Sequence, residues 1–131
     1  AIGKAGINKK DIDDKNYFIK MSGNATFKVA VKRMSNVILE ALEYNDLKID
    51  DVNLLIPHQA NQRIISAVAE KLKFPVEKII MTIQKYGNTS AASIPIGIGD
   101  ARSTGKIKPG DISVLGVVGA GLTWGSAVIK W

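Results

Sequence analysis

The chain has 131 residues, of which 46% are hydrophobic, and it carries a formal net charge of +6 at neutral pH. This length is enough for one domain with a buried core. Cysteine is absent, which excludes disulfides, thiolate zinc sites and a cysteine nucleophile within these residues. No apolar run reaches the roughly 20 residues of a membrane span, and no signal-peptide pattern opens the sequence. We therefore expect a cytoplasmic protein with no membrane partner.

The first predicted elements are two helices preceded by irregular chain. Residues 1–16 are polar without a sustained apolar period, so we expect a surface loop, followed by a short strand over 17–21. From Ala25 to about Tyr44 apolar residues recur every three or four positions, which predicts a helix. Asn61 is suited to cap a second helix. Its inner face would consist of Ile64, Ile65, Val68, Ala69 and Leu72.

Four further strands are predicted, over 54–57, 79–83, 112–118 and 123–131. The apolar run 112–118 is typical of a strand buried on both faces, and only a short glycine-rich link joins it to the last strand, so these two should pair antiparallel. Residues 90–103 fit either a strand or a helix. We interpret them as a buried helix with small residues where another backbone comes close. The order of the elements predicts an α/β fold with a mostly parallel sheet and an antiparallel edge.

Two polar segments follow predicted strands. His58, the only histidine, comes directly after Pro57, and Asn88 lies in the second segment with Thr89 and Ser90. Ligands collect at the carboxyl ends of strands in open α/β sheets, so the two segments can converge on one site. Their side chains are suited to donate hydrogen bonds to a developing oxyanion, each worth roughly 3 kcal/mol in a dry site. The alternative is that His58 is a structural histidine and Asn88 a turn former.

Other kinds of site are disfavoured. One histidine with scattered carboxylates does not make a metal site, so we expect no metal. The segment GAGLTWG (119–125) differs from a dinucleotide loop, because its third glycine comes one position late and a strand follows. The few aromatic residues do not interleave with basic ones, so we expect no nucleic-acid partner. The positive charge fits either an acidic or phosphorylated partner or a solvated lysine-rich surface.

Four segments carry a family resemblance. MSGNATFK (21–28), PHQANQRII (57–65), YGNTSAASIP (86–95) and GAGLTWG (119–125) together resemble the carboxyl-terminal half of β-ketoacyl-acyl carrier protein synthase III, a thiolase-fold condensing enzyme. The resemblance implies one carboxyl-terminal thiolase-like domain over residues 1–131, with helices on both faces of the sheet. It also implies a five-stranded sheet in the order 3-2-1-4-5, whose first strand would lie before Ala1. Residues 112–118 would then pair with backbone outside these 131 residues.

The resemblance also implies a reaction. In that family a cysteine of the amino-terminal half is acylated by acyl-CoA, usually acetyl-CoA. Residues at the positions of His58 and Asn88 then hold the enolate oxygen that forms as malonyl-acyl carrier protein loses carbon dioxide, and the carbanion attacks the thioester. The thioesters of CoA and phosphopantetheine are substrates, so no separate cofactor is expected. The implied partners are acyl carrier protein, acyl-CoA and the amino-terminal half, and the intact protein would be a homodimer.

Further positions match the family's binding residues. Those implied to line the pantetheine tunnel and the loop beside the nucleophile are Gly23, Phe27, Ala60, Asn61, Gly119 and Gly121. Basic positions implied to dock the acidic carrier protein are Lys28, Arg63 and Lys71. Two alternatives stay open, a non-catalytic subunit that binds carrier protein and a related thiolase-fold acyltransferase. The presence of both His58 and Asn88 favours an enzyme, because a pure binding module needs neither.

Overall fold

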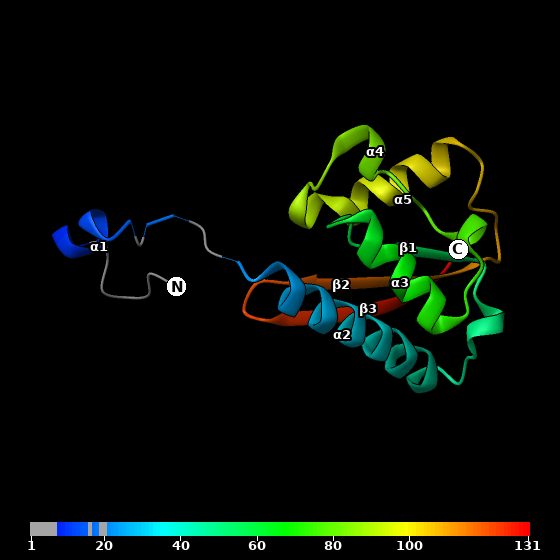
Figure 1. The fold of residues 1–131 in the computed structure, drawn as a ribbon. Helices are drawn as coiled ribbons and strands as arrows, with labels where there is room; N and C mark the ends of the chain where they lie inside the picture. Colours follow the sequence, from blue (N-terminus) through cyan, green and yellow to red (C-terminus); the bar gives the residue numbers. More distant parts are fainter. Residues whose placement is uncertain (1–7, 16, 19–20) are drawn as a thin grey trace.

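A three-stranded mixed sheet lies at the centre of the computed structural model, which describes residues 8–15, 17–18 and 21–131 (Figure 1). The strands stand side by side in the order β1 (Leu54–Pro57), β2 (Ile112–Gly119) and β3 (Thr123–Lys130). β1 is parallel to β2, with Leu55 opposite Val114. β2 and β3 form an antiparallel hairpin in which Val114 is opposite Val128.

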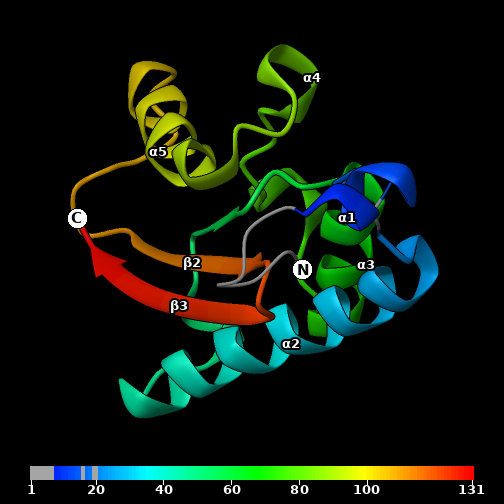
Figure 2. The ribbon, with the colours of Figure 1, turned by 90° about the vertical axis from the view of Figure 1, so that its left-hand side faces the viewer.

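Helices cover both faces of this sheet. Figure 2 shows α2 (Gly23–Tyr44) below the sheet and α5 (Ser93–Ser103) with the short α4 (Ile83–Tyr86) above it. The helix α3 (Gln62–Leu72) packs beside α2 on the lower face. Single 3₁₀ turns at Ile49–Asp51, Val76–Lys78 and Ser90–Ala92 connect these elements. The molecule is therefore a mixed α/β structure of three layers.

The alternation of side chains along β1 divides the core into two parts. Leu55 points to the lower face, where it joins Met34 and Ile38 of α2 and the apolar face of α3. Leu54 and Ile56 point to the upper face, against Ala101 of α5. All four residues of β1 are buried because helices lie on both sides of it.

Most predicted elements are confirmed. The helix predicted from Ala25 begins two residues earlier as α2, and the five apolar residues of the predicted inner face of α3 are all buried. The side-chain oxygen of Asn61 accepts a hydrogen bond from the Arg63 N–H at 2.8 Å, as expected of a helix cap. The helical interpretation of the ambiguous segment is also correct. Its close contact is with a side chain, however, because a Cβ atom on Gly97 would lie 2.9 Å from Cγ2 of Ile56.

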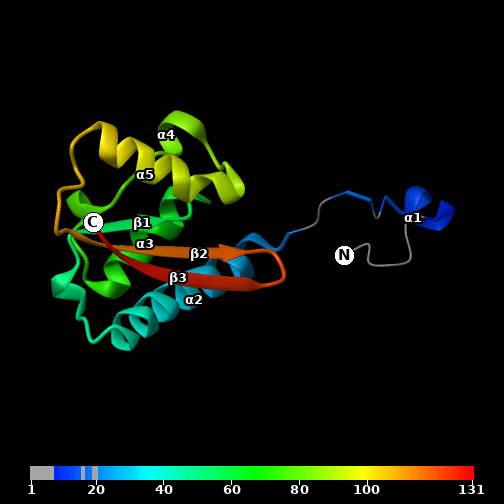
Figure 3. The same cartoon turned by 180° about the vertical axis from the view of Figure 1, so that it is seen from behind.

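The amino-terminal prediction is wrong in part. Residues Lys9–Asp13 form a short helix, α1, which Figures 1 and 3 show away from the sheet. Its start is fixed by Asn8 and Asp11, whose side chains each accept a hydrogen bond from the other's backbone N–H. This reciprocal cap consists of polar side chains, so it leaves no apolar period from which the helix could be predicted. The strand predicted over 17–21 falls partly outside the described residues, and Tyr17 and Phe18 lie in a turn and a bend.

The strand predicted over 79–83 is also wrong. Ile79 forms a single parallel bridge with Leu55, and the chain then leaves the sheet and enters α4 at Ile83. The reason is that the side chain of Gln59 accepts hydrogen bonds from the N–H groups of Thr82 and Ile83. These groups are bonded to an amide side chain and not to a neighbouring strand.

The expected surroundings of residues 112–118 need correction too. β2 is bonded on both sides within the chain, to β1 and to β3, so the prediction that it pairs with outside backbone is wrong. The backbone N–H groups of Asn53 and His58 donate to Ile112 and Gly116 of β2. Within residues 21–131 the unpaired edge beyond the hairpin belongs to β3. Nor is β2 buried on both faces, because Leu115 and Val117 on the side of α5 are only half-buried.

Candidate active site

A cavity of about 1000 Å³ opens at the edge of the sheet where β1 and β2 end and β3 begins. Its walls come from the first half of α2, the start of α3, the loop before α5 and the β2–β3 connection. Figures 1 and 3 show that this connection lies beside the start of α2. The lining is mostly apolar and includes the predicted site residues His58, Ala60, Asn88, Gly119 and Gly121.

His58 is placed by β1. The side chains of Leu54 and Ile56 face α5, and the period of two carries His58 to the same side. Its backbone N–H donates to the Gly116 carbonyl at 2.8 Å, which extends the ladder by one residue. Its Nδ1 atom lies 3.0 Å from Oγ of Ser93 in α5. The ring is half-buried, and burial lowers the pKa of His58 below its usual value of 6.5. The lowered pKa favours the neutral imidazole at pH 7.

Asn88 reaches the same cavity by a different route from the one predicted. It follows α4, and the turn at Gly87 has a φ of 68°, which favours glycine. The Oδ1 atom of Asn88 accepts a hydrogen bond from the Ser90 N–H at 3.0 Å. This bond orients the side chain, whose amide NH₂ group can donate to a ligand.

The other residues implied to bind substrate divide into two groups. Ala60, Gly119 and Gly121 line the large cavity, whereas Gly23, Phe27 and Asn61 do not. Gly23 is the first residue of α2, and Asn61 caps α3. The hydrogen bond from the Arg63 N–H to the Asn61 side chain gives Asn61 a structural role that needs no ligand.

The basic positions lie on α2 and α3. The guanidinium carbon of Arg63 lies 5.6 Å from the centre of the Phe27 ring, and the two residues border a shallow hollow of about 410 Å³ on the surface. Lys28 and Lys71 are exposed on the same two helices but line neither the hollow nor the large cavity. Of the three predicted docking residues, only Arg63 borders one of these two cavities.

Sequence reasoning missed two residues that shape the site. Ser93 is 1% exposed and contacts the ring of His58, and Gln59 is equally buried, with its side chain bonded to backbone groups around residues 80–83. The side chain of Gln59 turns away from the cavity into the core. A glutamine between Pro57 and an apolar helix carries no signal that distinguishes these two orientations.

The described residues, 8–15, 17–18 and 21–131, offer neither a metal site nor a membrane-spanning helix. No group of three or more His, Cys, Asp or Glu side chains there could hold a metal ion. None of the helices described above is both long and apolar enough to cross a bilayer.

Comparison with known proteins places the chain in a family. The family model described as 3-oxoacyl-[acyl-carrier-protein (ACP)] synthase III C terminal matches residues 42–131. The β-ketoacyl-[acyl-carrier-protein] synthase III of Aquifex aeolicus is 52% identical over 114 residues, which are 87% of this chain and 37% of that protein. The synthase III 1 of Halalkalibacterium halodurans is 48% identical over 130 residues, which are 99% of this chain and 42% of that protein.

Solved structures agree. The crystal structure of the Aquifex aeolicus 3-oxoacyl-[acyl-carrier-protein] synthase III has a TM-score of 0.85 at 51% identity and covers 90% of this chain, which matches 38% of that one. The corresponding Pseudomonas aeruginosa structure has a TM-score of 0.86 at 37% identity, covering 96% of this chain and 38% of its own. The fold is thus part of the thiolase-like half that the resemblance implied, with three strands where five were implied, and the chain spans about two fifths of the length of these relatives. The chain belongs to the family of 3-oxoacyl-[acyl-carrier-protein] synthase III carboxyl-terminal domains.

Proposed function

We propose that this chain forms the carboxyl-terminal part of a β-ketoacyl-acyl carrier protein synthase III, a condensing acyltransferase of fatty acid synthesis. The reaction joins the acyl group of acyl-CoA, with acetyl-CoA as the expected donor, to malonyl-acyl carrier protein. The carboxyl group of the malonyl thioester leaves as carbon dioxide, and the electron pair of the broken bond passes into an enolate. The enolate carbon then attacks the acyl thioester on the enzyme, a carbon–carbon bond forms, and the cysteine thiolate leaves.

The observation that carries this proposal is the pair of donors in one largely apolar cavity. The lowered pKa of His58 favours the neutral ring, which can present one N–H group, and Asn88, whose oxygen accepts a bond from Ser90, carries an amide NH₂ group that can donate. Two neutral donors stabilise negative charge on a thioester oxygen without attracting the malonyl carboxylate, which must leave. Removal of one such donor costs roughly 3 kcal/mol of transition-state stabilisation.

The acylated cysteine must come from another part of the protein, since these 131 residues contain none. The relatives that match the chain are longer, which is compatible with this division. Two features of the structure offer a surface for that part. The outer edge of β3 is not paired within the described sheet, and the side chains of Leu115 and Val117 are only half-covered beside α5. Val117 and the first residues of β3, Thr123, Trp124 and Gly125, also line the cavity.

The carrier protein is the proposed macromolecular partner. Its acidic surface complements the net charge of +6, and the hollow at Arg63 and Phe27 lies on the same pair of helices as Lys28 and Lys71. Coulomb attraction across such a surface speeds association more than it strengthens the final complex. The phosphopantetheine arm would then extend from this surface toward the cavity.

The test is carbon dioxide release from malonyl-acyl carrier protein by the full-length protein that carries this chain. The variants His58→Ala and Asn88→Ala should each lower kcat by about 100-fold or more, while acyl transfer from CoA to the enzyme stays near the wild-type rate. Asn45→Ala is the matched control, because Asn45 is exposed at the far end of α2. If both variants decarboxylate at the wild-type rate, the proposed roles are wrong.

A further inference from the structure

A chain of hydroxyl groups leads from the loop before α5 to the ring of His58. Oγ of Ser93 lies 3.0 Å from Nδ1 of His58 and 3.3 Å from Oγ1 of Thr89. Ser93 is 1% exposed, so its hydroxyl has no access to bulk water. The direction in which the Ser93 hydroxyl donates is therefore coupled to which nitrogen of the His58 ring is protonated.

Ser93 has one hydroxyl proton and two neighbours. It can donate to Nδ1 and accept from Thr89, or it can accept from a protonated Nδ1 and donate to Thr89. The contact with Nδ1 is the shorter one, and an imidazole nitrogen is a better acceptor than a hydroxyl. The first arrangement places the ring proton on Nε2, away from Ser93.

The helix adds a second reason for this arrangement. Ser93 is the first residue of α5, which has 11 residues and continues the 3₁₀ turn Ser90–Ala92, so Nδ1 contacts a side chain from the amino-terminal end of the helix, where the dipole is positive. A lone pair is favoured there over an N–H group, and the neutral ring is favoured over the charged one.

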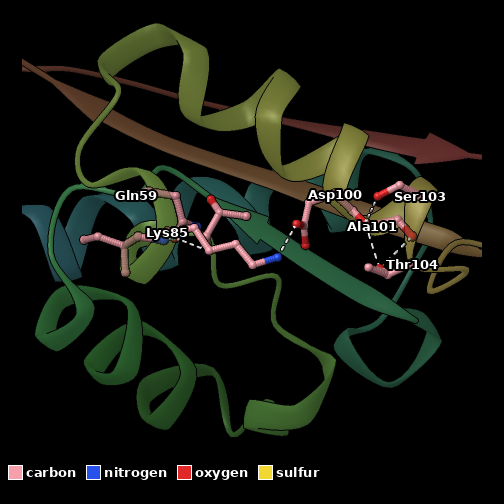
Figure 4. Close-up of polar contacts among 8 residues, drawn as sticks. Gln59, Lys85, Asp100, Ala101, Ser103 and Thr104 are labelled. Atoms are coloured by element: carbon pink, nitrogen blue, oxygen red, sulfur yellow. Dashed lines mark hydrogen bonds and ion pairs between the residues drawn. The ribbon is translucent and has the colours of Figure 1, made fainter.

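The position of α5 is fixed by close packing, since Gly97 sits against the side chain of Ile56 in β1. It is also joined to α4 by the ion pair of Lys85 and Asp100 at 2.8 Å (Figure 4).

We propose that Ser93 is a positioning residue that holds His58 in the tautomer with its proton on Nε2, with Thr89 supporting Ser93 from behind. This inference rests on the proposed function in one respect, because the Nε2 proton is then the donor that binds the enolate oxygen. Without the Ser93 hydroxyl, the ring would divide between two tautomers and rotate more freely. Only part of the population would present a donor to the substrate.

The experiment has two readouts on the full-length protein labelled with ¹⁵N-histidine. The first is the ¹⁵N spectrum of His58, assigned by comparison with His58→Asn, which reports which ring nitrogen is protonated. The second is kcat for carbon dioxide release from malonyl-acyl carrier protein. Ser93→Ala removes the hydroxyl, and Ser93→Cys replaces it with a weaker donor that fills the same space, which covers the case in which alanine disturbs folding. Ser103→Ala is the matched control, because its exposed hydroxyl bonds only to the Asp100 carbonyl at the other end of α5.

We expect the wild type to show a protonated Nε2 and an unprotonated Nδ1 that accepts a hydrogen bond. Ser93→Ala should show a mixture of tautomers and a kcat about fivefold lower, with little change in KM, the effect of one net hydrogen bond. Ser93→Cys should change both readouts in the same direction, and Ser103→Ala should change neither.

The outcomes separate the two proposals. A protonated Nδ1 in the wild type, or an unchanged spectrum and kcat in both Ser93 variants, would overturn the role of Ser93 while leaving the proposed function intact. Full decarboxylation activity in a His58→Ala variant would overturn the proposed function, and the spectrum would still decide whether Ser93 sets the tautomer.

Discussion

The side chain of Gln59 takes the place of a missing strand neighbour for Thr82. Its Oε1 atom accepts hydrogen bonds from the N–H groups of Thr82 at 3.0 Å and Ile83 at 3.1 Å, and its Nε2 atom donates to the carbonyls of Pro57 and Ile80. All four bonding positions of the amide are occupied. One side chain next to His58 thus fixes the path of the chain that leads to Asn88.

The first prediction concerns this buried amide. Gln59→Leu should lower the free energy of unfolding by about 2–4 kcal/mol, because it leaves buried backbone donors and acceptors without partners. Urea unfolding of the full-length protein measures the change. Gln84→Leu is the control, since Gln84 is exposed in α4. It should change the free energy of unfolding by less than about 0.5 kcal/mol. Equal stabilities of the two variants would contradict the structural role of Gln59.

The second prediction is the pH dependence of His58. Burial lowers its pKa in the folded state, so the NMR titration of this ring should have its midpoint below 6.5. This shift makes stability depend on pH. As pH falls through 6.5, the unfolded chain binds a proton at His58 while the folded chain, with its lower pKa, does not yet bind one. The stability of the wild type should therefore fall below pH 6.5 relative to a His58→Gln variant, which does not titrate. Parallel curves from pH 8 to pH 5 would show that the ring is not desolvated.

The third prediction compares two glycines of α5. A Cβ atom on Gly97 would lie 2.9 Å from the buried side chain of Ile56, whereas one on Gly99 would meet nothing within 4 Å. Alanine raises helix propensity equally at both positions, so this contribution to stability cancels when the two variants are compared. Gly97→Ala should be less stable than Gly99→Ala by about 1–3 kcal/mol, the cost of overpacking. Thermal unfolding of both variants measures the difference, and equal melting temperatures would show that α5 is not packed this closely on β1.

The fourth prediction concerns the docking of carrier protein. Arg63→Glu should weaken binding of acyl carrier protein by roughly tenfold at low ionic strength, because one attraction becomes a repulsion and the contact with Phe27 is lost. Acetyl transfer from CoA should change little. The effect should shrink as salt is added.

Its control is a second charge reversal with the same net charge. Lys106→Glu lies in the exposed loop after α5 and should leave carrier-protein binding near the wild-type value. If the two variants bind alike, the attraction depends on overall charge, and the surface at Arg63 is not the docking site.

Local patterns in the sequence were sufficient for the elements whose neighbours are near in the chain. Spacing of three and four predicted α2 and α3, and the polar side chain of Asn61 predicted where α3 begins. The apolar run that ends at Pro57 predicted β1 and with it the position of His58 at the end of a strand. The glycine-rich link predicted the antiparallel hairpin, because a short connection leaves the next strand no other geometry.

Partners that are distant in the chain were decided only by the tertiary structure. The apolar residues from Ile79 look like a strand by composition, yet the bonds from Gln59, more than twenty positions away, draw Thr82 and Ile83 out of the sheet. The neighbour of β2 is likewise β1, a choice that depends on packing across the whole domain. Sequence placed His58 and Asn88 in two loops. Their convergence was expected from the sequence, but only the fold brought both to one cavity of defined walls and set Ser93 against the ring, because such contacts depend on where separate elements pack.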